Sequence, residues 1–295
     1  MDFTMKDLER ELAEDGKVGA VVVVGGGFAG KLHAAAWRKL NYSVSIIDID
    51  PDVCDDCSCG DDSSCKGIND CLSSLIDFVH IVDFCDAPKS RLQYAERFKD
   101  KLKGKIVYFE KPVCRPCDVQ RYIDLTKELD IVPIHNYLFM LPPWLTKEKQ
   151  LEVSILRKGP HKGWYIDLDL TGSGIIGDHG YHWLYVADEM GADISQMKGW
   201  VDGVPDMTCR VESLDEKFKM YATWRSPMRM TTLNGKPDEF RTSGRMADSF
   251  MKLFDSTLKY ESERRRLVDQ SIRVMKCIEK VYGISGLPTS RDGEE

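Results

Sequence analysis

Three glycines have the spacing needed to bind a dinucleotide. Gly25, Gly27 and Gly30 fill the glycine positions of a G-x-G-x-x-G pattern, directly after the β-branched run 21–24. In this pattern the first glycine permits a sharp turn, the second lets the backbone approach a pyrophosphate, and the third lets the next helix pack on the strand. The free N–H groups at the start of that helix would point at the phosphates. The pattern therefore predicts a dinucleotide site.

An aspartate at the end of the next predicted strand indicates which dinucleotide binds. Asp48 follows the strand 43–47 and lies about 20 residues beyond the glycines, the usual spacing for a carboxylate that binds the adenosine ribose hydroxyls. Such a carboxylate would repel a ribose 2′-phosphate. We therefore predict NAD as the cofactor and consider NADP the less favoured choice.

Three further residues have the types that suit proton transfer and charge stabilisation. Lys111 directly follows the predicted strand 105–109, and ligands in open α/β sheets bind beyond the carboxyl ends of the strands. Asp178 and His182 are four residues apart in a stretch of helical character, so their side chains share one face. A histidine with a pKa near ~6.5 can exchange a proton at neutral pH. His179 is a competing histidine in the same stretch.

These groups need rigid elements to position them, and in the first part of the chain strands and helices alternate. This alternation predicts an α/β fold, with a doubly wound parallel sheet of the Rossmann type in a dinucleotide-binding domain over residues 1–135. Residues 1–16 form a helical extension outside this core. The predicted strands are 17–24, 43–48, 78–84, 105–109 and 131–134, and the predicted helices are 28–40, 90–102 and 118–129.

The pattern changes in the second part of the chain, where short strands with alternating hydrophobicity predominate. We predict an α+β domain over residues 136–295, with an open, largely antiparallel sheet. Its helical segments are 177–190 and a long stretch from Ala247 to Tyr282. The predicted strands are 151–156, 197–201, 208–213, 217–224 and 228–233.

Composition and charge exclude several classes of protein. The chain has 295 residues and a net charge of −7. Its densest basic run, 264–266, is flanked by the acidic residues Glu261, Glu263 and Asp269, so a nucleic-acid partner is not expected. No segment approaches the ~18 to 20 uninterrupted apolar residues of a membrane span. The N-terminus is acidic and amphipathic, unlike a secretory signal, and we expect a cytoplasmic protein.

Taken together, three motifs resemble those of the Gfo/Idh/MocA oxidoreductases, which include glucose–fructose oxidoreductase and inositol dehydrogenase. The first is the glycine turn at 25–30, the second is Glu110-Lys111-Pro112, and the third is G-S-G-I-I-G-D-H-G-Y-H over 172–182. The resemblance covers the chain from about Val18 to Tyr282. It implies an NAD(P)-dependent dehydrogenase that oxidises a hydroxyl of a sugar, cyclitol or related polyol to a ketone, or catalyses the reverse reaction.

The resemblance also implies roles for individual residues. Lys111, Asp178 and His182 match the catalytic set. The histidine would accept the hydroxyl proton, the aspartate would orient the imidazole or hydrogen-bond the same substrate hydroxyl, and the lysine would stabilise the developing alkoxide. A small-molecule substrate and homo-oligomer formation through the C-terminal sheet are expected. The positions that match the cofactor-binding pattern are Gly25, Gly27, Phe28, Ala29, Gly30, Asp48, Asp86, Pro88, Glu110, Lys111 and Asn136.

Two other functions fit parts of the same pattern. Relatives such as biliverdin reductase share the architecture, so a reductase of a C=N or C=C bond is an alternative. A non-catalytic NAD-binding redox sensor is another, suggested by the cysteines beside Asp48. Substrate identity is not determined by the sequence: Arg225, Arg229 and Arg241 are the arginines that could bind a phosphate or carboxylate, and the sequence does not place them.

A cluster of cysteines departs from the family pattern. Cys54, Cys57, Cys59 and Cys65 lie in the acidic stretch 50–70, which we expect to be an irregular loop with a short helix at its end, and Cys71 directly follows this stretch. Disulfides, free thiols and a metal site on the first four are all open interpretations. The spacing fits no common metal site, so we predict no bound metal.

A second pair of cysteines directly follows the E-K-P motif. Cys114 and Cys117 form C-R-P-C, which could be a redox pair, a local disulfide or a plain helix start.

Overall fold

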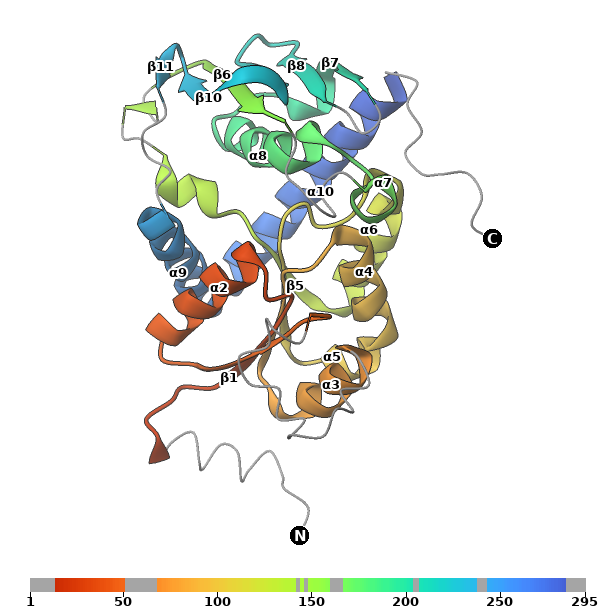
Figure 1. Ribbon diagram of the computed structural model, residues 1–295, viewed down its shortest axis with the longest axis vertical. Helices are drawn as coiled ribbons and strands as arrows, with labels where there is room; N and C mark the ends of the chain where they lie inside the picture. The colour runs from red at the N-terminus through yellow and green to blue at the C-terminus, as the bar shows by residue number, and fades with distance from the viewer. Residues whose placement is uncertain are drawn as a thin grey trace.

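The computed structural model describes residues 14–50, 68–141, 144–145, 148–159, 167–203, 207–237 and 243–284. It consists of two sheets with helices packed around and between them (Figure 1). None of the described helices is long and apolar enough to cross a membrane. Residues 1–13 of the predicted extension at 1–16, and residues 51–67 of the cysteine-rich stretch, lie outside the described residues.

The first sheet is parallel and has five strands in the order β2-β1-β3-β4-β5. Strand β1, which lies between β2 and β3, is a run of alanine and valine buried on both faces, as expected for a parallel sheet covered by helices. The strand order reverses at β1, and ligands in such sheets bind outside the carboxyl ends at this point. The strands are β1 (Ala20–Val24), β2 (Ser43–Ile47), β3 (Ile81–Phe84), β4 (Ile106–Phe109) and β5 (Asp130–Pro133).

The three helices predicted in this part are present, and a further short helix lies at residues 68–75, between the second and third strands. The predicted helix over 90–102 is divided in two at Phe98, into α4 and α5. The helical elements of this part are α2 (Phe28–Lys39), α3 (Ile68–Leu75), η2 (Ile76–Phe78), α4 (Pro88–Arg97), α5 (Lys99–Leu102), η3 (Pro116–Asp118) and α6 (Val119–Glu128).

The second sheet is mixed and mostly antiparallel, with six strands in the order β11-β10-β6-β9-β8-β7. Among the described strands of this second sheet, only the pair β6 and β9 is parallel. The strands are β6 (Leu151–Lys158), β7 (Met197–Asp202), β8 (Thr208–Ser213), β9 (Phe218–Thr223), β10 (Arg225–Leu233) and β11 (Lys236–Pro237). The predicted Rossmann sheet and the open, largely antiparallel sheet are both confirmed.

Shorter helical elements lie between the strands along the chain, and one of them, at residues 176–180, contacts β9 of the second sheet. They are η4 (Asn136–Met140), α7 (Leu168–Thr171), η7 (Ile176–Gly180), α8 (Tyr181–Glu189) and η8 (Ile194–Gln196). The predicted helix over 177–190 is therefore a π turn, η7, followed by the α-helix α8. π turns inside helices are frequent at functional sites.

The C-terminal helices join the two parts. The predicted helical stretch is interrupted at Tyr260, which separates α9 (Ser243–Lys259) from α10 (Glu261–Ile284). Helix α9 packs against α2, while α10 contacts β5 and α6 of the first part and α8 and β7 of the second. In Figure 1, α10 runs through the middle of the molecule between the two sheets. These helices therefore hold the two parts of the chain in their relative positions.

Candidate active site

The glycine turn closes against the strand ends of the first sheet. Gly25 has a φ of +98°, and a Cβ there would lie 2.9 Å from the backbone nitrogen of Asp86. A Cβ at Gly30 would lie 1.8 Å from the Gly25 carbonyl oxygen, so only glycine lets α2 begin this close to β1. A Cβ at Gly27 would meet no atom within 4 Å. The glycine turn therefore packs closely at Gly25 and Gly30, and it leaves open space beside Gly27.

Asp48 lies beside this turn at the end of β2. Its Oδ2 accepts a hydrogen bond from the Gly26 N–H at 2.6 Å, and its Oδ1 accepts one from the Asp50 N–H at 2.9 Å. The structure thus brings the predicted ribose-binding carboxylate next to the predicted pyrophosphate loop.

The loop after β3 carries Asp86 directly against the glycine turn. Burial raises the pKa of Asp86 to about 7, and the guanidinium of Arg91, whose Nε lies 3.8 Å from Oδ1, only partly opposes this. Neither carboxylate oxygen has a hydrogen-bond partner among the described residues. Arg91 instead donates to the backbone carbonyls of Asp86 and Glu110, and so ties the loop to the end of β4.

Lys111 and Asp178 come from different parts of the chain and meet directly. Lys111 follows β4, and its Nζ lies 2.8 Å from Oδ1 of Asp178 in the π turn η7. Nε2 of His179 lies 3.4 Å from Oδ2 of the same carboxylate. Both Asp178 and His179 are buried. One carboxylate therefore faces an ammonium group and an imidazole.

His182 lies one turn further along, where α8 begins. Its ring is stacked on Tyr137, with the ring centroids 3.6 Å apart and the planes at 1°. Asn136, the neighbouring residue, donates to Ser249 of α9 at 3.0 Å. The segment that joins the two sheets therefore orients the imidazole and is itself held by the C-terminal helices.

A single cleft of about 290 Å³ collects most of these groups. The sequence predicts Lys111, Asp178 and His182 here, and it did not predict Arg157 or the residues of α9. Arg157 lies at an even spacing along β6 from Leu151, Val153 and Ile155, so its side chain is expected on the same face of the sheet. This alternation was the signal in the sequence that could have placed it. Of the arginines that the sequence does not place, Arg229 lines the cleft, Arg225 pairs with Asp202 at 2.5 Å, and Arg241 lies outside the described residues. The lining residues are Phe28, Ala29, Leu32, Glu110, Lys111, Asn136, Tyr137, Arg157, Asp178, His179, His182, Arg229, Met246 and Phe250.

The other predicted cofactor positions lie around the glycine turn and do not line this cleft. They are Gly25, Gly27, Gly30, Asp48, Asp86 and Pro88, which opens helix α4. The candidate site therefore has two adjoining regions. The glycine turn presents strand ends and backbone N–H groups, and the cleft presents acid–base side chains. The remaining predicted cofactor positions line the cleft itself: Phe28, Ala29, Glu110, Lys111 and Asn136.

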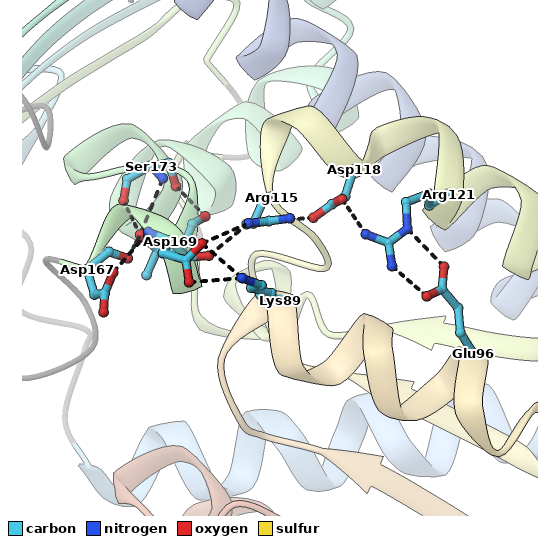
Figure 2. Close-up of polar contacts among 9 residues, drawn as sticks. Lys89, Glu96, Arg115, Asp118, Arg121, Asp167, Asp169 and Ser173 are labelled. Carbon is cyan, nitrogen blue, oxygen red and sulfur yellow. Dashed lines mark hydrogen bonds and ion pairs between the residues drawn. The ribbon is translucent and has the colours of Figure 1, made fainter. Parts of the chain in front are cut away.

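A chain of ion pairs fixes the segment that precedes the π turn (Figure 2). Both carboxylate oxygens of Asp169 in α7 accept bonds from Lys89 of α4 at 2.9 Å. Arg115 donates to the Asp169 carbonyl at 2.9 Å and to Asp118 at 2.6 Å. Asp118 in turn pairs with Arg121 at 2.7 Å. These contacts hold the second part of the chain against the first beside the cleft.

The C-R-P-C segment has a packing role in this arrangement. Gly172, with a φ of +63°, lies so close to it that a Cβ there would be 2.6 Å from Cβ of Arg115. Cys114 and Cys117 are free thiols, and burial raises the pKa of both. A raised pKa disfavours the reactive thiolate, which argues against the redox pair. Cys71 is likewise buried, while Cys54, Cys57, Cys59 and Cys65 lie outside the described residues.

A second polar cluster, which the sequence did not reveal, lies behind the cleft wall. Asp83 in the middle of β3 pairs with Nδ1 of His33 at 3.0 Å and accepts from Nε1 of Trp37 at 2.7 Å. Cys85 Sγ lies 3.1 Å from the same His33 nitrogen. The ring of His33 packs on Phe250, which lines the cleft. An aspartate within an otherwise apolar strand was the available signal.

Comparison with known proteins shows the fold. No family model matches the chain, and no curated protein matches its sequence. Among solved structures, GenD2 from gentamicin A biosynthesis in complex with NAD is 16% identical with a TM-score of 0.69, covering 94% of this chain and 95% of that one.

Two further solved structures match over similar lengths. The WlbA (WbpB) dehydrogenase from Thermus thermophilus in complex with NAD and UDP-GlcNAcA is 14% identical with a TM-score of 0.63, covering 88% of this chain and 94% of that one. UDP-N-acetylglucosamine 3-dehydrogenase GnnA from Acidithiobacillus ferrooxidans is 13% identical with a TM-score of 0.59, covering 89% and 98%. The chain thus has the two-sheet fold that its resemblance to the Gfo/Idh/MocA oxidoreductases predicts.

Proposed function

We propose that the protein is an NAD-dependent oxidoreductase that oxidises a hydroxyl group of a sugar, cyclitol or related polyol to a ketone, or catalyses the reverse reduction. The observation that carries this proposal is the meeting of Lys111 with Asp178 at 2.8 Å, in a cleft also lined by His182 and by the start of α2. Solved structures of the same fold include dehydrogenases in complex with NAD.

The residues around the glycine turn fit a dinucleotide. Open space lies beside Gly27, where the pyrophosphate would approach, and α2 begins at the next residue with its N–H groups toward that space. The carboxylate of Asp48, fixed by the Gly26 N–H, would accept bonds from the adenosine ribose hydroxyls. Phe28, Ala29, Glu110 and Asn136 would line the path from the turn to the cleft.

The side chains of the cleft supply the proton chemistry. NAD, when bound, supplies the acceptor for the hydride. The Lys111 ammonium group stabilises negative charge on the substrate oxygen and so lowers the pKa of the hydroxyl. His182, held against Tyr137, accepts the hydroxyl proton at an imidazole nitrogen, and donates it back in the reverse direction. Asp178 holds the lysine in place and keeps its charge in the cleft.

The proposal has a direct test. The purified protein is screened with sugars, cyclitols and polyols in the presence of NAD or NADP, and turnover is read from the absorbance of the reduced cofactor. We expect NAD-dependent turnover that His182→Ala abolishes while NAD binding is retained. NAD binding without turnover of any hydroxyl substrate would favour the redox sensor, and oxidation of the reduced cofactor by a C=N or C=C substrate would favour the reductase.

The outer face of the second sheet is a candidate surface for oligomer formation. A row of side chains on the outer face of the second sheet runs from Trp200 through Arg210 to Tyr221, and both aromatic residues are exposed. We propose that this face forms a homo-oligomer, which sedimentation analysis of Trp200→Asp would test. The domain boundary near residue 135 and a cytoplasmic location also remain predictions.

A further inference from the structure

We infer that Arg91 is the positioning residue of Lys111, and that it ties the placement of this lysine to the loop that carries Asp86. The inference rests on the proposed function, because it assigns a residue that acts through the lysine of the same cleft. Arg91 lies in α4 and does not line the cleft, so it would not touch the substrate. Its contacts with the backbone around Lys111 carry the inference.

Arg91 is an arginine buried inside the first part of the chain. Its side chain is 1% exposed, and its guanidinium lies 5.9 Å from the centroid of the Phe109 ring. Arginine is almost never fully buried unless it is paired or hydrogen-bonded, because removing its charge from water is costly. Helix α4 carries a second arginine, Arg97, that is exposed and avoids this cost. The burial of Arg91 is therefore explained by the groups that its guanidinium binds.

The guanidinium binds the backbone on both sides of Lys111. Its Nη1 donates to the carbonyl of Glu110, the residue before the lysine, and to the carbonyl of Pro112, the residue after it, at 2.7 Å. Hydrogen bonds from a charged donor are shorter and stronger than those between neutral groups. Since the two acceptors flank the lysine, these bonds fix the path of the backbone through Lys111.

The same guanidinium also holds the loop after β3. Its Nη2 donates to the carbonyl of Asp86, and its Nε lies 3.8 Å from Oδ1 of that residue. Asp86 in turn lies against the glycine turn, where a Cβ at Gly25 would be 2.9 Å from the Asp86 nitrogen. One buried side chain therefore joins the turn expected to bind the cofactor to the strand end that carries Lys111.

Lys111 needs a fixed backbone because its partner comes from the other part of the chain. Its Nζ lies 2.8 Å from Oδ1 of Asp178 and 3.2 Å from the Asp178 carbonyl oxygen, and its side chain is 13% exposed. A lysine side chain is long and flexible, so the place of its ammonium group depends on where the backbone holds its base. A displacement of about 1 Å in a reacting site can lower the rate about 100-fold. Arg91 therefore acts on the reaction through Lys111.

Steady-state kinetics of Arg91→Lys at saturating NAD test this role. The substituted side chain keeps a buried positive charge, but it cannot bind three carbonyls as a planar guanidinium does. We expect kcat to fall about 10- to 100-fold while KM for the substrate stays within about threefold of the wild-type value, because Lys111 acts on charge that develops in the transition state. The matched control is Arg97→Lys, on the same helix but exposed, which should leave both constants unchanged.

A double-mutant cycle separates positioning from a loss of stability. In a Lys111→Ala background, Arg91→Lys should lower kcat no further, because the residue through which it acts is gone. A substitution that slowed the reaction only by loosening the fold would lower kcat by the same factor in both backgrounds. Thermal unfolding checks that each variant folds. Should Arg91→Lys not fold, Arg91→Gln takes its place, since it removes the buried charge and keeps an N–H donor for the carbonyls.

Chemical labelling measures the placement of Lys111 without requiring turnover. The protein is treated with acetic anhydride, and the rate of acetylation at each lysine is measured by peptide mass spectrometry. Because the ion pair with Asp178 keeps the Lys111 amine charged and partly covered, its release should raise the acetylation rate about threefold or more in either Arg91 variant. Lys127, which is exposed on α6, is the internal control and should react at an unchanged rate.

The outcomes separate this inference from the proposed function. The inference is wrong if acetylation of Lys111 is unchanged, if kcat stays within threefold of the wild type, or if kcat falls equally in both backgrounds. Turnover of a polyol with any of these results would leave the proposed function standing alone. Faster acetylation of Lys111 in the Arg91 variants, with no reaction of any hydroxyl compound in the wild type, would support the placement of Lys111 by Arg91 and contradict the proposed function.

Discussion

Asp83 and Asp178 are two buried aspartates, each paired with a basic side chain, in very different surroundings. Asp83 lies inside β3 with no exposed surface, and His33 and Trp37 saturate it with hydrogen bonds. Asp178 is 7% exposed, lies in a π turn and lines the cleft, where it meets Lys111. The two sites have similar chemical groups and differ in access.

The electrostatics of the closed site explain its role. Burial lowers the pKa of His33, but the Asp83 carboxylate outweighs this and holds the pKa above its ordinary value. Burial also raises the pKa of the neighbouring Cys85 thiol far above its usual range, which disfavours a thiolate. A charged pair that no solvent or ligand reaches ties α2 to β3. Access to the cleft, rather than the presence of acid–base groups, distinguishes the site proposed for catalysis.

The largest effect should come from Lys111 at the open site. We expect Lys111→Ala to lower kcat about 10²- to 10⁴-fold, because charge on the substrate oxygen loses its stabilising group. Steady-state kinetics with the best substrate of the screen measure this, and thermal unfolding of the same variant should show that it folds. Activity within tenfold of the wild type would contradict a role for Lys111 in the reaction.

At the closed site the expected effect is on stability instead. Asp83→Ala leaves His33 and the Trp37 N–H buried without their acceptor, which should cost roughly 3–5 kcal/mol of unfolding free energy. Denaturant unfolding measures this loss, and kcat of the folded variant should stay near the wild-type value. The control is Asp202→Ala, an exposed ion-paired aspartate whose loss should cost no more than about 1 kcal/mol. Equal losses in the two variants would remove the distinction between the sites.

Substituting the two histidines of the open site one at a time shows which of them accepts the proton. His182→Gln should lower kcat/KM about 100-fold, in the range for a general base. His179→Gln, which removes only the imidazole 3.4 Å from Asp178, should have a smaller effect of about tenfold or less. The reverse order would assign the base to His179. Both variants are compared at the same pH, with NAD affinity measured in parallel.

The smallest effect expected is a pH dependence from Asp86. Its pKa of about 7 lies above that of the unfolded chain, so between pH 4 and 7 the folded state retains a proton that the unfolded state has lost. The stability that this proton confers is therefore lost as pH rises to about 7. Relative to the wild type, Asp86→Asn should become more stable by roughly 1 kcal/mol or more between pH 5 and pH 8.

Urea unfolding of both proteins at pH 5, 6, 7 and 8 measures this difference. A constant difference across the range would show that Asp86 does not titrate there. NAD affinity over the same range should fall above pH 7 in the wild type alone, because the carboxylate lies against the turn expected to hold the pyrophosphate.

Much of the scaffold could be predicted because its signals are local. The β-branched run followed by spaced glycines requires a strand, a tight turn and a helix, and Lys111 follows a short apolar strand. The alternating segments of the second part each form a strand of the mixed sheet. Breaks at Phe98 and Tyr260 were not predicted, because neither position carries the glycine or proline that usually ends a helix.

The sequence by itself determined the parallel sheet, the glycine turn beside Asp48, and the residue types available for proton transfer. Only the tertiary structure decided which of these groups meet. The pairing of Lys111 with Asp178 and the ring of Tyr137 on His182 join segments far apart in the chain. Such contacts depend on how sheets and helices pack, and in particular on α10, which no local pattern specifies.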